Sequence, residues 1–230
     1  MIPTLFLHGA LGTSDQLKPI VDQLNLNQPV HLLNFEGHGS EIIPDRPFRI
    51  EHFAENVLDY MEEEGIEKTD LFGYSMGGFV ALYLSKIKPE RVGKIATLGT
   101  ILEWNKEIAE NEAAFLIPNK IKEKVPKFAK FLSEQHPNGW ESVVNKTREA
   151  LLNLGEHPVI AADEWKELEH TVRIHVGDRD QTADPIKSIQ VCSKLKRGEL
   201  VVLPNSYHPV EKTDFHLLIH SLNDYFKLNR

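Results

Sequence analysis

Ser75 is the residue in this sequence best suited to act as a nucleophile. It lies in the segment Gly-Tyr-Ser-Met-Gly-Gly (residues 73–78), between the apolar stretch Asp70–Phe72 and a helical pattern over Phe79–Ile87. Glycines on both sides of the serine leave room for a tight turn from a strand into a helix, and such a turn exposes the hydroxyl. The alternative is a glycine-rich turn with an incidental serine. The strand and helix around the motif favour the nucleophile.

A serine hydroxyl needs a base to attack at neutral pH, and eleven histidines are available. His208 follows the apolar stretch Leu200–Leu203, in a loop beyond the end of an expected strand, where parallel sheets place their functional groups. His175 lies inside a strand pattern and is expected in the core. His216 and His220 are spaced i, i+4 on a helical segment without a third ligand, so a solvated helix face is expected and no metal site.

The base needs an acceptor that holds its imidazole in the right tautomer. Two carboxylates follow the strand pattern at Val172–Val176, in Gly177-Asp178-Arg179-Asp180, and Asp184 is a weaker third. Asp178 directly follows the turn glycine and is expected to bond the loop backbone. Asp180 lies further along the loop, nearer to a histidine on the next loop. The predicted catalytic set is therefore Ser75, Asp180 and His208, with Asp178 as the alternative acid.

Acyl transfer also needs two backbone N–H groups that stabilise the oxyanion of the tetrahedral intermediate. One is expected from Met76, which follows the nucleophile. The other is expected from the loop His8–Gly12, with Ala10 as the preferred donor and Leu11 as the alternative. His8 and His38 lie in glycine turns and are expected to hold these loops by hydrogen bonds.

The elements that must position these residues alternate between strand and helix. This order predicts an α/β fold with a mostly parallel sheet of about six strands and helices on both faces. The strand patterns are Ile2–Leu7, Val30–Phe35, Asp70–Phe72, Val92–Leu98, Val172–Val176 and Leu200–Leu203, and the helical ones are Asp15–Leu24, Ile50–Glu64, Phe79–Ile87 and Asp214–Phe226.

The alternation stops between residues 103 and 168, where the pattern is helical, polar and interrupted by four prolines. We expect this segment to form a helical cap inserted into a core made of residues 1–102 and 169–230. A basic cluster in it either attracts an anionic substrate or forms a solvated helix face, and the second interpretation is preferred. The lysines are Lys120, Lys122, Lys124, Lys127 and Lys130, and the aromatic residues that either line a pocket or pack the cap are Trp104, Phe115, Phe128, Phe131 and Trp140.

Six motifs occur in an order that resembles the α/β-hydrolase superfamily over nearly the whole chain. The resemblance implies this fold, which usually has eight strands. Here the chain begins at what would be the third, leaving six. Two positions depart from the pattern: Asn34-Phe35-Glu36 replaces Asp-x-Pro, and Phe79 stands where the menaquinone-pathway lyase has an arginine. The motifs are His-Gly-x-x-Gly at 8–12, Gly-His-Gly-Ser at 37–40, Gly-Tyr-Ser-Met-Gly-Gly at 73–78, Pro-Glu-Arg-Val at 89–92, Gly-Asp-Arg-Asp at 177–180, and His208.

Composition narrows the function further. The chain has 230 residues and a net charge of −8, a sign that repels nucleic acid. It has a single cysteine, Cys192, and no stretch of about 20 apolar residues, so we expect a cytoplasmic protein without a membrane span. We expect a serine hydrolase of carboxylic esters or thioesters that acts on a small acyl substrate without a cofactor. A C–C bond hydrolase, a lyase, or a ligand receptor without turnover are the alternatives, and the oligomeric state is open.

Overall fold

A six-stranded sheet forms the centre of the protein, in a computed structural model that describes residues 1–227. The strand order is β2-β1-β3-β4-β5-β6, and all five neighbouring pairs are parallel. The predicted α/β class with about six strands is therefore confirmed. The strands are β1 (Thr4–Leu7), β2 (Val30–Leu33), β3 (Thr69–Tyr74), β4 (Val92–Leu98), β5 (Thr171–Gly177) and β6 (Arg197–Leu203).

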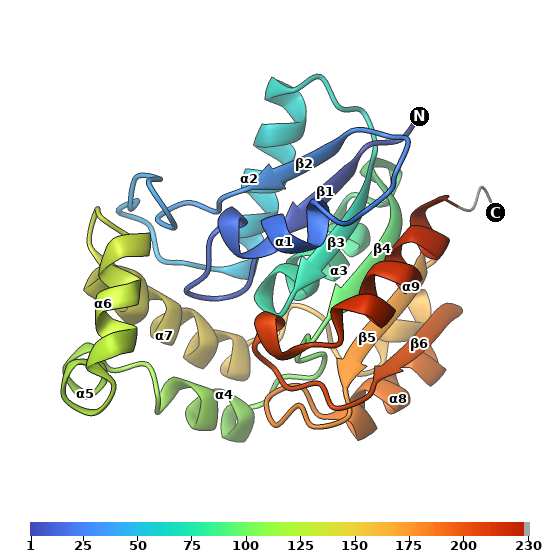
Figure 1. The fold of residues 1–230 in the computed structure, drawn as a ribbon. Helices are drawn as coiled ribbons and strands as arrows, with labels where there is room; N and C mark the ends of the chain where they lie inside the picture. The colour runs from blue at the N-terminus through green and yellow to red at the C-terminus, as the bar shows by residue number, and fades with distance from the viewer. Residues whose placement is uncertain (228–230) are drawn as a thin grey trace.

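Helices cover both faces of this sheet (Figure 1). Strand side chains alternate between the faces, so that Leu71 of β3 packs on one side and Phe72 on the other. The apolar sides of α1 and α9 cover the face of Phe72, and those of α2, α3 and α8 cover the face of Leu71. These helices are α1 (Lys18–Val21), α2 (Ile50–Glu63), α3 (Met76–Ile87), α8 (Pro185–Lys194) and α9 (Phe215–Lys227).

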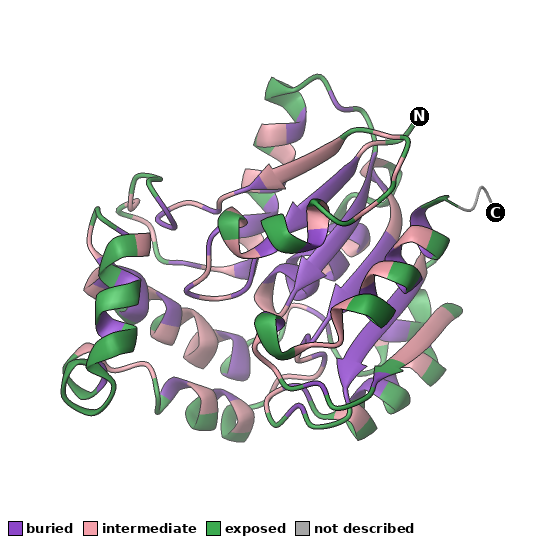
Figure 2. Ribbon diagram, in the orientation of Figure 1, coloured by how far each residue is buried: buried purple, intermediate pink, exposed green. Residues whose placement is uncertain are grey.

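Burial explains why the strands read as apolar runs. β1 and β3 are buried along their whole length, whereas the edge strands β2 and β6 are mostly half-exposed (Figure 2). A parallel strand covered on both faces needs apolar side chains at successive positions rather than alternate ones.

Two helices differ from their predicted bounds. The helix expected over Asp15–Leu24 is a 3-10 turn at Ser14–Leu17 followed by the short α1. After α1 the backbone makes i to i+3 hydrogen bonds, from Gln23 to Ile20 and from Leu24 to Val21, so the chain turns away. α3 begins at Met76 instead of Phe79, because Gly77, which packs against β1, and Gly78, which packs against Gly73 of β3, belong to the helix.

Four further helices lie beyond the carboxyl ends of the strands (Figure 1). They are consecutive in sequence, and α4 packs along α7. After them, residues 157–168 return to the sheet, where Glu164 forms an ion pair of 2.7 Å with Lys86 of α3. The helices are α4 (Lys106–Ala113), α5 (Pro118–Lys124), α6 (Pro126–Gln135) and α7 (Trp140–Glu156).

His136 ties the end of α6 to two loops of the sheet. Its Nδ1 accepts from the N–H of Gly39 at 2.9 Å, so its Nε2 carries the proton and donates to the carbonyl of Leu11 at 3.0 Å. The neighbouring Gln135 accepts from the hydroxyl of Thr13 at 2.9 Å. These contacts connect the helices above the sheet to the loop after β1.

Replacing His136 should therefore destabilise the protein. In His136→Ala the buried N–H of Gly39 and the carbonyl of Leu11 lose their partner, and we expect the free energy of unfolding to fall by about 1–3 kcal/mol. Urea denaturation measures this change. His157→Ala is the matched control, because His157 also ends a helix but is exposed. Equal stability of the two variants would show that the contact contributes nothing.

Buried histidines make the fold sensitive to acid. Burial lowers the pKa of His8 and of His175 to about 4, and it also lowers the pKa of His38 and His136. His175 is fully buried between the carbonyl of Thr97 and the hydroxyl of Ser221. In the unfolded chain these groups return to a pKa near 6.5.

Because the folded pKa values are lower, the unfolded chain binds more protons, and stability falls as the pH drops from 6.5 towards 4. Above pH 6.5 these histidines are neutral in both the folded and the unfolded state, so the free energy of unfolding loses nothing through them. We expect His175→Gln to flatten this dependence in urea denaturation series between pH 7.5 and 4.5. His216→Gln, at an exposed position of α9, should keep the wild-type slope. A wild-type stability that does not change over this range would contradict the prediction.

Candidate active site

Ser75 lies in a strained turn between β3 and α3. Its φ is 50°, in the left-handed region that residues other than glycine rarely adopt. Two contacts with the end of β4 and the loop after it hold this conformation: the N–H of Ser75 donates to Leu98 at 2.8 Å, and its carbonyl accepts from the hydroxyl of Thr100 at 3.0 Å. Strain of this kind costs about 1–3 kcal/mol and persists only where the surroundings enforce it.

The glycines around Ser75 are required by close backbone contacts. A Cβ atom on Gly73 would lie 2.3 Å from the backbone nitrogen of Gly78, and one on Gly77 would lie 2.3 Å from the carbonyl oxygen of Leu7. No side chain fits at these distances. The motif read from the sequence thus has a steric cause, which is the close approach of α3 to β1 and β3.

His208 faces the Ser75 hydroxyl from the loop after β6. The distance from Ser75 Oγ to His208 Nε2 is 3.2 Å. Tyr74 supports the imidazole, because its hydroxyl donates to the carbonyl of His208 at 3.0 Å and its ring lies 5.6 Å from the imidazole. The histidine is thereby held over the strand that carries the serine.

Asp180 lies on the other side of the imidazole. Its carboxylate oxygens are 3.0 and 3.1 Å from His208 Nδ1, and the N–H groups of Thr182 and Ala183 donate to Oδ1 at 2.9 and 2.8 Å. A carboxylate only accepts, so we assign the imidazole proton to Nδ1. Nε2 is then free to accept from the Ser75 hydroxyl. The three side chains form one hydrogen-bonded row.

The other two carboxylates of this loop contact backbone. Asp178 Oδ1 accepts from the N–H of Ser206 at 3.1 Å, and Asp184 caps α8 by accepting from Ile186 at 2.8 Å. Neither forms a hydrogen bond with His208 among the described residues. The structure thus brings together Asp180, His208 and Ser75, as the sequence analysis preferred, and gives Asp178 the backbone contact expected of it.

The loop after β1 reaches the cavity that contains Ser75. Ala10, Leu11 and Met76 line the same cavity as Ser75. Leu11 has a φ of 56°, and its carbonyl is the group that His136 binds. Two expected loop contacts are also present: His8 bonds the carbonyl of Gly9 at 2.8 Å and the N–H of Phe35 at 3.1 Å. His38, in its own glycine turn, bonds the carbonyl of Glu36 at 3.0 Å.

A cavity of about 240 Å³ lies between Ser75 and two of the helices above it, α4 and α7. The lining from this segment consists of Trp104, Phe115 and Leu116 at the ends of α4, Glu112 of α4 and one face of α7, so two of the five aromatic residues named in the sequence analysis line the cavity. Phe128 and Phe131 line an outer groove instead, and Trp140 is buried. The groove shares five lining residues with the cavity, namely Ala10, Leu11, Gln16, Tyr74 and His208.

Three residues near the site were not found by sequence reasoning. Gly99 has a φ of 59°, and a Cβ there would lie 3.1 Å from Asp180 Oδ2 and 3.3 Å from His208 Nδ1. A glycine directly after a strand was the available signal. Glu112 of α4 lines the cavity, and His136 supports the loop after β1. Nothing in the sequence distinguished these two from other polar residues of the insertion.

No metal ligand set accompanies the site. Within residues 1–227, no three histidine, cysteine, aspartate or glutamate side chains gather closely enough to hold a metal ion. In the same part of the chain, no helix combines the length and the apolar character needed to cross a membrane. The arrangement consists of a hydroxyl, an imidazole and a carboxylate in hydrogen-bonding contact at the edge of a cavity.

Comparisons with known proteins find relatives of the same fold. The (E)-2-((N-methylformamido)methylene)succinate hydrolase of Acinetobacter baylyi is 20% identical over 225 residues, which cover 92% of this chain and 85% of that protein. A thermophilic esterase of Thermogutta terrifontis has a similar structure, with a TM-score of 0.80, 16% identity, and coverage of 99% of this chain and 90% of the esterase. The 2-hydroxy-6-oxo-6-phenylhexa-2,4-dienoate hydrolase of a Rhodococcus species is also similar in structure, with a TM-score of 0.73 and 23% identity. The match covers 99% of this chain and 91% of that hydrolase.

The structural likenesses show a shared fold at low identity. The sequence itself carries the assignment further, because the family model described as alpha/beta hydrolase fold matches residues 3–153, more than half of the chain. The order of motifs read from the sequence points to the same family. The chain belongs to the α/β-hydrolase fold family.

Proposed function

We propose that this protein is a serine hydrolase that cleaves a carboxylic ester or thioester of a small molecule through an acyl-enzyme. The observation that carries the proposal is the hydrogen-bonded row of Ser75, His208 and Asp180. The distances within this row are those that such catalysis needs, which supports the roles of nucleophile for Ser75, general base for His208 and orienting carboxylate for Asp180. The Acinetobacter protein and several of the similar solved structures are named as hydrolases or esterases, which supports the proposal.

In the acylation step, Ser75 Oγ attacks the substrate carbonyl while His208 Nε2 takes its proton. Asp180 stabilises the imidazolium that forms and itself stays ionised. When the tetrahedral intermediate collapses, His208 donates this proton to the leaving alcohol or thiol. A water molecule then attacks the acyl-enzyme with His208 again as the base, and Ser75 regains its proton.

The oxyanion of each tetrahedral intermediate needs donors near Ser75. We propose the N–H of Met76, at the first turn of α3, and the N–H of Ala10, with Leu11 as the alternative. The hydrogen bond from His136 to the Leu11 carbonyl supports this loop. The proposed steps use no metal or organic cofactor. The two charges that develop are the oxyanion, which the backbone N–H groups stabilise, and the imidazolium of His208, which Asp180 stabilises.

We also propose that residues 103–168 form a cap over a core of residues 1–102 and 169–230. The cavity supports this division, because side chains from α4 and α7 face Ser75 across it. A cap of this kind excludes water and shapes the substrate pocket. The lone cysteine, Cys192, is free, which suits the reducing cytosol where we propose the enzyme works.

A second candidate is hydrolysis of a C–C bond with the same residues. The likeness to the Rhodococcus hydrolase named for a phenylhexadienoate supports it, at the level of the fold. Ester hydrolysis is preferred because a carboxylic ester needs only the groups already in place. Assays with p-nitrophenyl esters and with a vinylogous diketone substrate distinguish the two candidates.

Covalent labelling tests the nucleophile. We expect a fluorophosphonate to modify Ser75, because an activated serine attacks the phosphorus centre rapidly. Mass spectrometry of the digested protein locates the adduct, and Ser75→Ala should abolish both the label and esterase activity. A label on another residue, or none on folded protein, would refute the proposal.

The loop carboxylates can be separated by paired variants. We expect Asp180→Asn to lower kcat by up to about four orders of magnitude, because an amide no longer holds the tautomer of His208. Asp178→Asn changes the same charge in the same loop but contacts only the backbone of Ser206, so kcat should fall by less than about tenfold. Steady-state hydrolysis of p-nitrophenyl butyrate measures both, and the reverse ranking would identify Asp178 as the acid.

A further inference from the structure

The charged side chains that line the candidate site are all acidic. Among the described residues, those lining the cavity include one carboxylate, Glu112, and no lysine or arginine. The outer groove adds Asp15 and Glu211, again without a basic residue. Asp15 is paired with Lys18 at 2.5 Å on the surface and Glu211 is exposed, so the carboxylate that lines the cavity next to the Ser75–His208–Asp180 row is that of Glu112.

Glu112 faces the catalytic residues from α4 without a cationic partner of its own. It is half-buried, and the charges that act on it are those of His208 and Asp180. Within residues 1–227, no lysine or arginine pairs with its carboxylate. Burial raises the pKa of Glu112, the nearby His208 lowers it, and Asp180 raises it further. A carboxylate that is partly removed from water acts more strongly on a bound charge than a solvated one does.

The basic cluster of the cap does not offset this charge. Lys122 pairs with Glu141 at 2.9 Å and Lys130 lies 3.7 Å from Glu134, so both face other surface groups. None of the five lysines of the cluster lines the cavity or the groove. This placement favours the solvated helix face and leaves an anionic substrate without a cation to bind.

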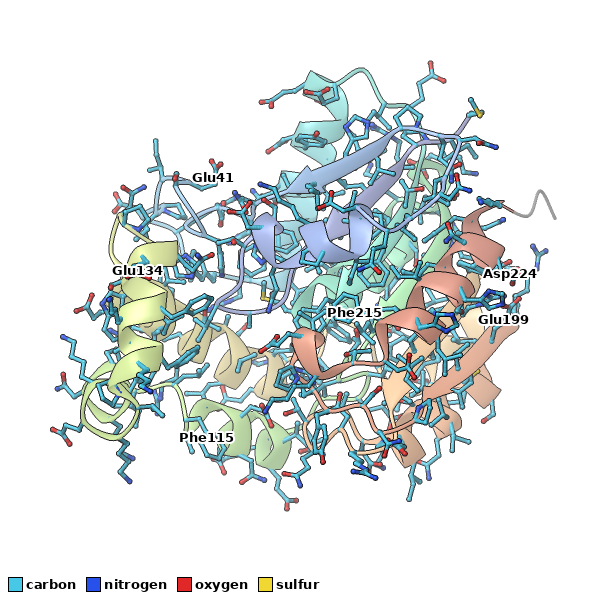
Figure 3. The ribbon with its side chains drawn as sticks, viewed as in Figure 1. Glu41, Phe115, Glu134, Glu199, Phe215 and Asp224 are labelled. Atoms are coloured by element: carbon cyan, nitrogen blue, oxygen red, sulfur yellow. The ribbon has the colours of Figure 1, made fainter. Side chains whose placement is uncertain are left out.

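Aromatic rings accompany the carboxylate. Trp104 precedes α4 and Phe115 follows it, as the label in Figure 3 shows for Phe115, and both line the cavity with Glu112. The side chain of Phe115 is 76% exposed. A carboxylate next to aromatic faces is the combination that recognises an amino or quaternary ammonium group, since both attract a cation.

We propose that Glu112 makes the site select substrates by charge, so that it accepts esters bearing an ammonium group, tolerates neutral ones and rejects carboxylates. This inference rests on the proposed esterase function and names its substrate class. Glu112 acts as a specificity-determining residue and takes no part in the proton transfers of Ser75 and His208.

Three p-nitrophenyl esters of equal length test the proposal: 4-aminobutyrate, pentanoate and hemiglutarate carry a cation, a methyl group and an anion at the same position. A second set places the charge on the leaving group and compares acetylcholine with its neutral analogue 3,3-dimethylbutyl acetate. A pH-stat measures the acid that each hydrolysis releases. In the wild-type protein, we expect kcat/KM to be highest for the cationic ester and lower for the neutral one in whichever set brings the charge near Glu112. In the first set the anionic ester should give the lowest value.

Glu112→Gln should reduce the ratio of cationic to anionic kcat/KM by on the order of tenfold or more, because the substitution removes the charge of the carboxylate and keeps the size of the side chain. Glu112→Lys should reverse the preference. Glu110→Gln is the matched control, because it removes the same charge from an exposed position of α4 and should leave every ratio unchanged. Thermal melts verify that the variants are folded.

If the ratio of cationic to anionic kcat/KM stays the same in Glu112→Gln and in Glu112→Lys, in both sets of esters, the selectivity proposal is wrong. The proposed function would still stand in that case, provided that the wild-type protein hydrolyses the pentanoate ester and is labelled at Ser75. A wild-type preference for the anion would overturn the selectivity proposal as well. Without labelling or hydrolysis of any ester, the proposed function fails, and the inference fails with it.

Discussion

The backbone of Ser75 is the constraint on which the rest of the site depends. A left-handed residue other than glycine is unfavourable, and here it is held by hydrogen bonds to Leu98 and from Thr100. Those bonds exist only because β4 lies next to β3 in the sheet. The turn that contains Ser75 also requires Gly73 and Gly77, since any side chain at these two positions would collide with backbone atoms. The exposed hydroxyl is therefore a product of the whole packing of β3, β4 and α3.

Parallel pairing explains why the other groups arrive at the same place. Since all six strands run in one direction, their carboxyl ends share one edge, and the loops after β1, β3, β5 and β6 meet there. Ala10, Ser75, Asp180 and His208 each come from one of these loops. Tyr74 and Gly99 complete the arrangement, one by bonding His208 and the other by leaving room beside it.

The four helices above this edge change the environment of the site. Two of them, α4 with its flanking residues and α7, provide aromatic and aliphatic walls to the cavity and a single carboxylate, Glu112, which faces His208. The four helices are also attached to the loop after β1 through His136, whose proton lies on Nε2 because Nδ1 accepts from Gly39. The geometry near the proposed oxyanion donors and the identity of the cavity walls are thus set by the same segment of the chain.

The sequence alone determined the fold class and the order of the strands along the chain, because local patterns carry that information. It also reduced the candidate catalytic residues to Ser75, His208 and one of two loop carboxylates. Buried parallel strands require apolar runs, and a tight turn requires glycines at Gly73 and Gly77. Helix limits were less certain: Gly77 reads as a turn residue but lies inside α3, where close packing against Leu7 excludes a side chain.

Only the tertiary structure decided which groups meet across long separations. Asp178 and Asp180 are two residues apart and chemically identical, and the direction of the loop after β5 turns one to Ser206 and the other to His208. Glu112 and His136 look like ordinary polar residues of a helical insertion. Their position depends on how that insertion packs over the sheet, which is set by non-local contacts that no local pattern in the sequence records.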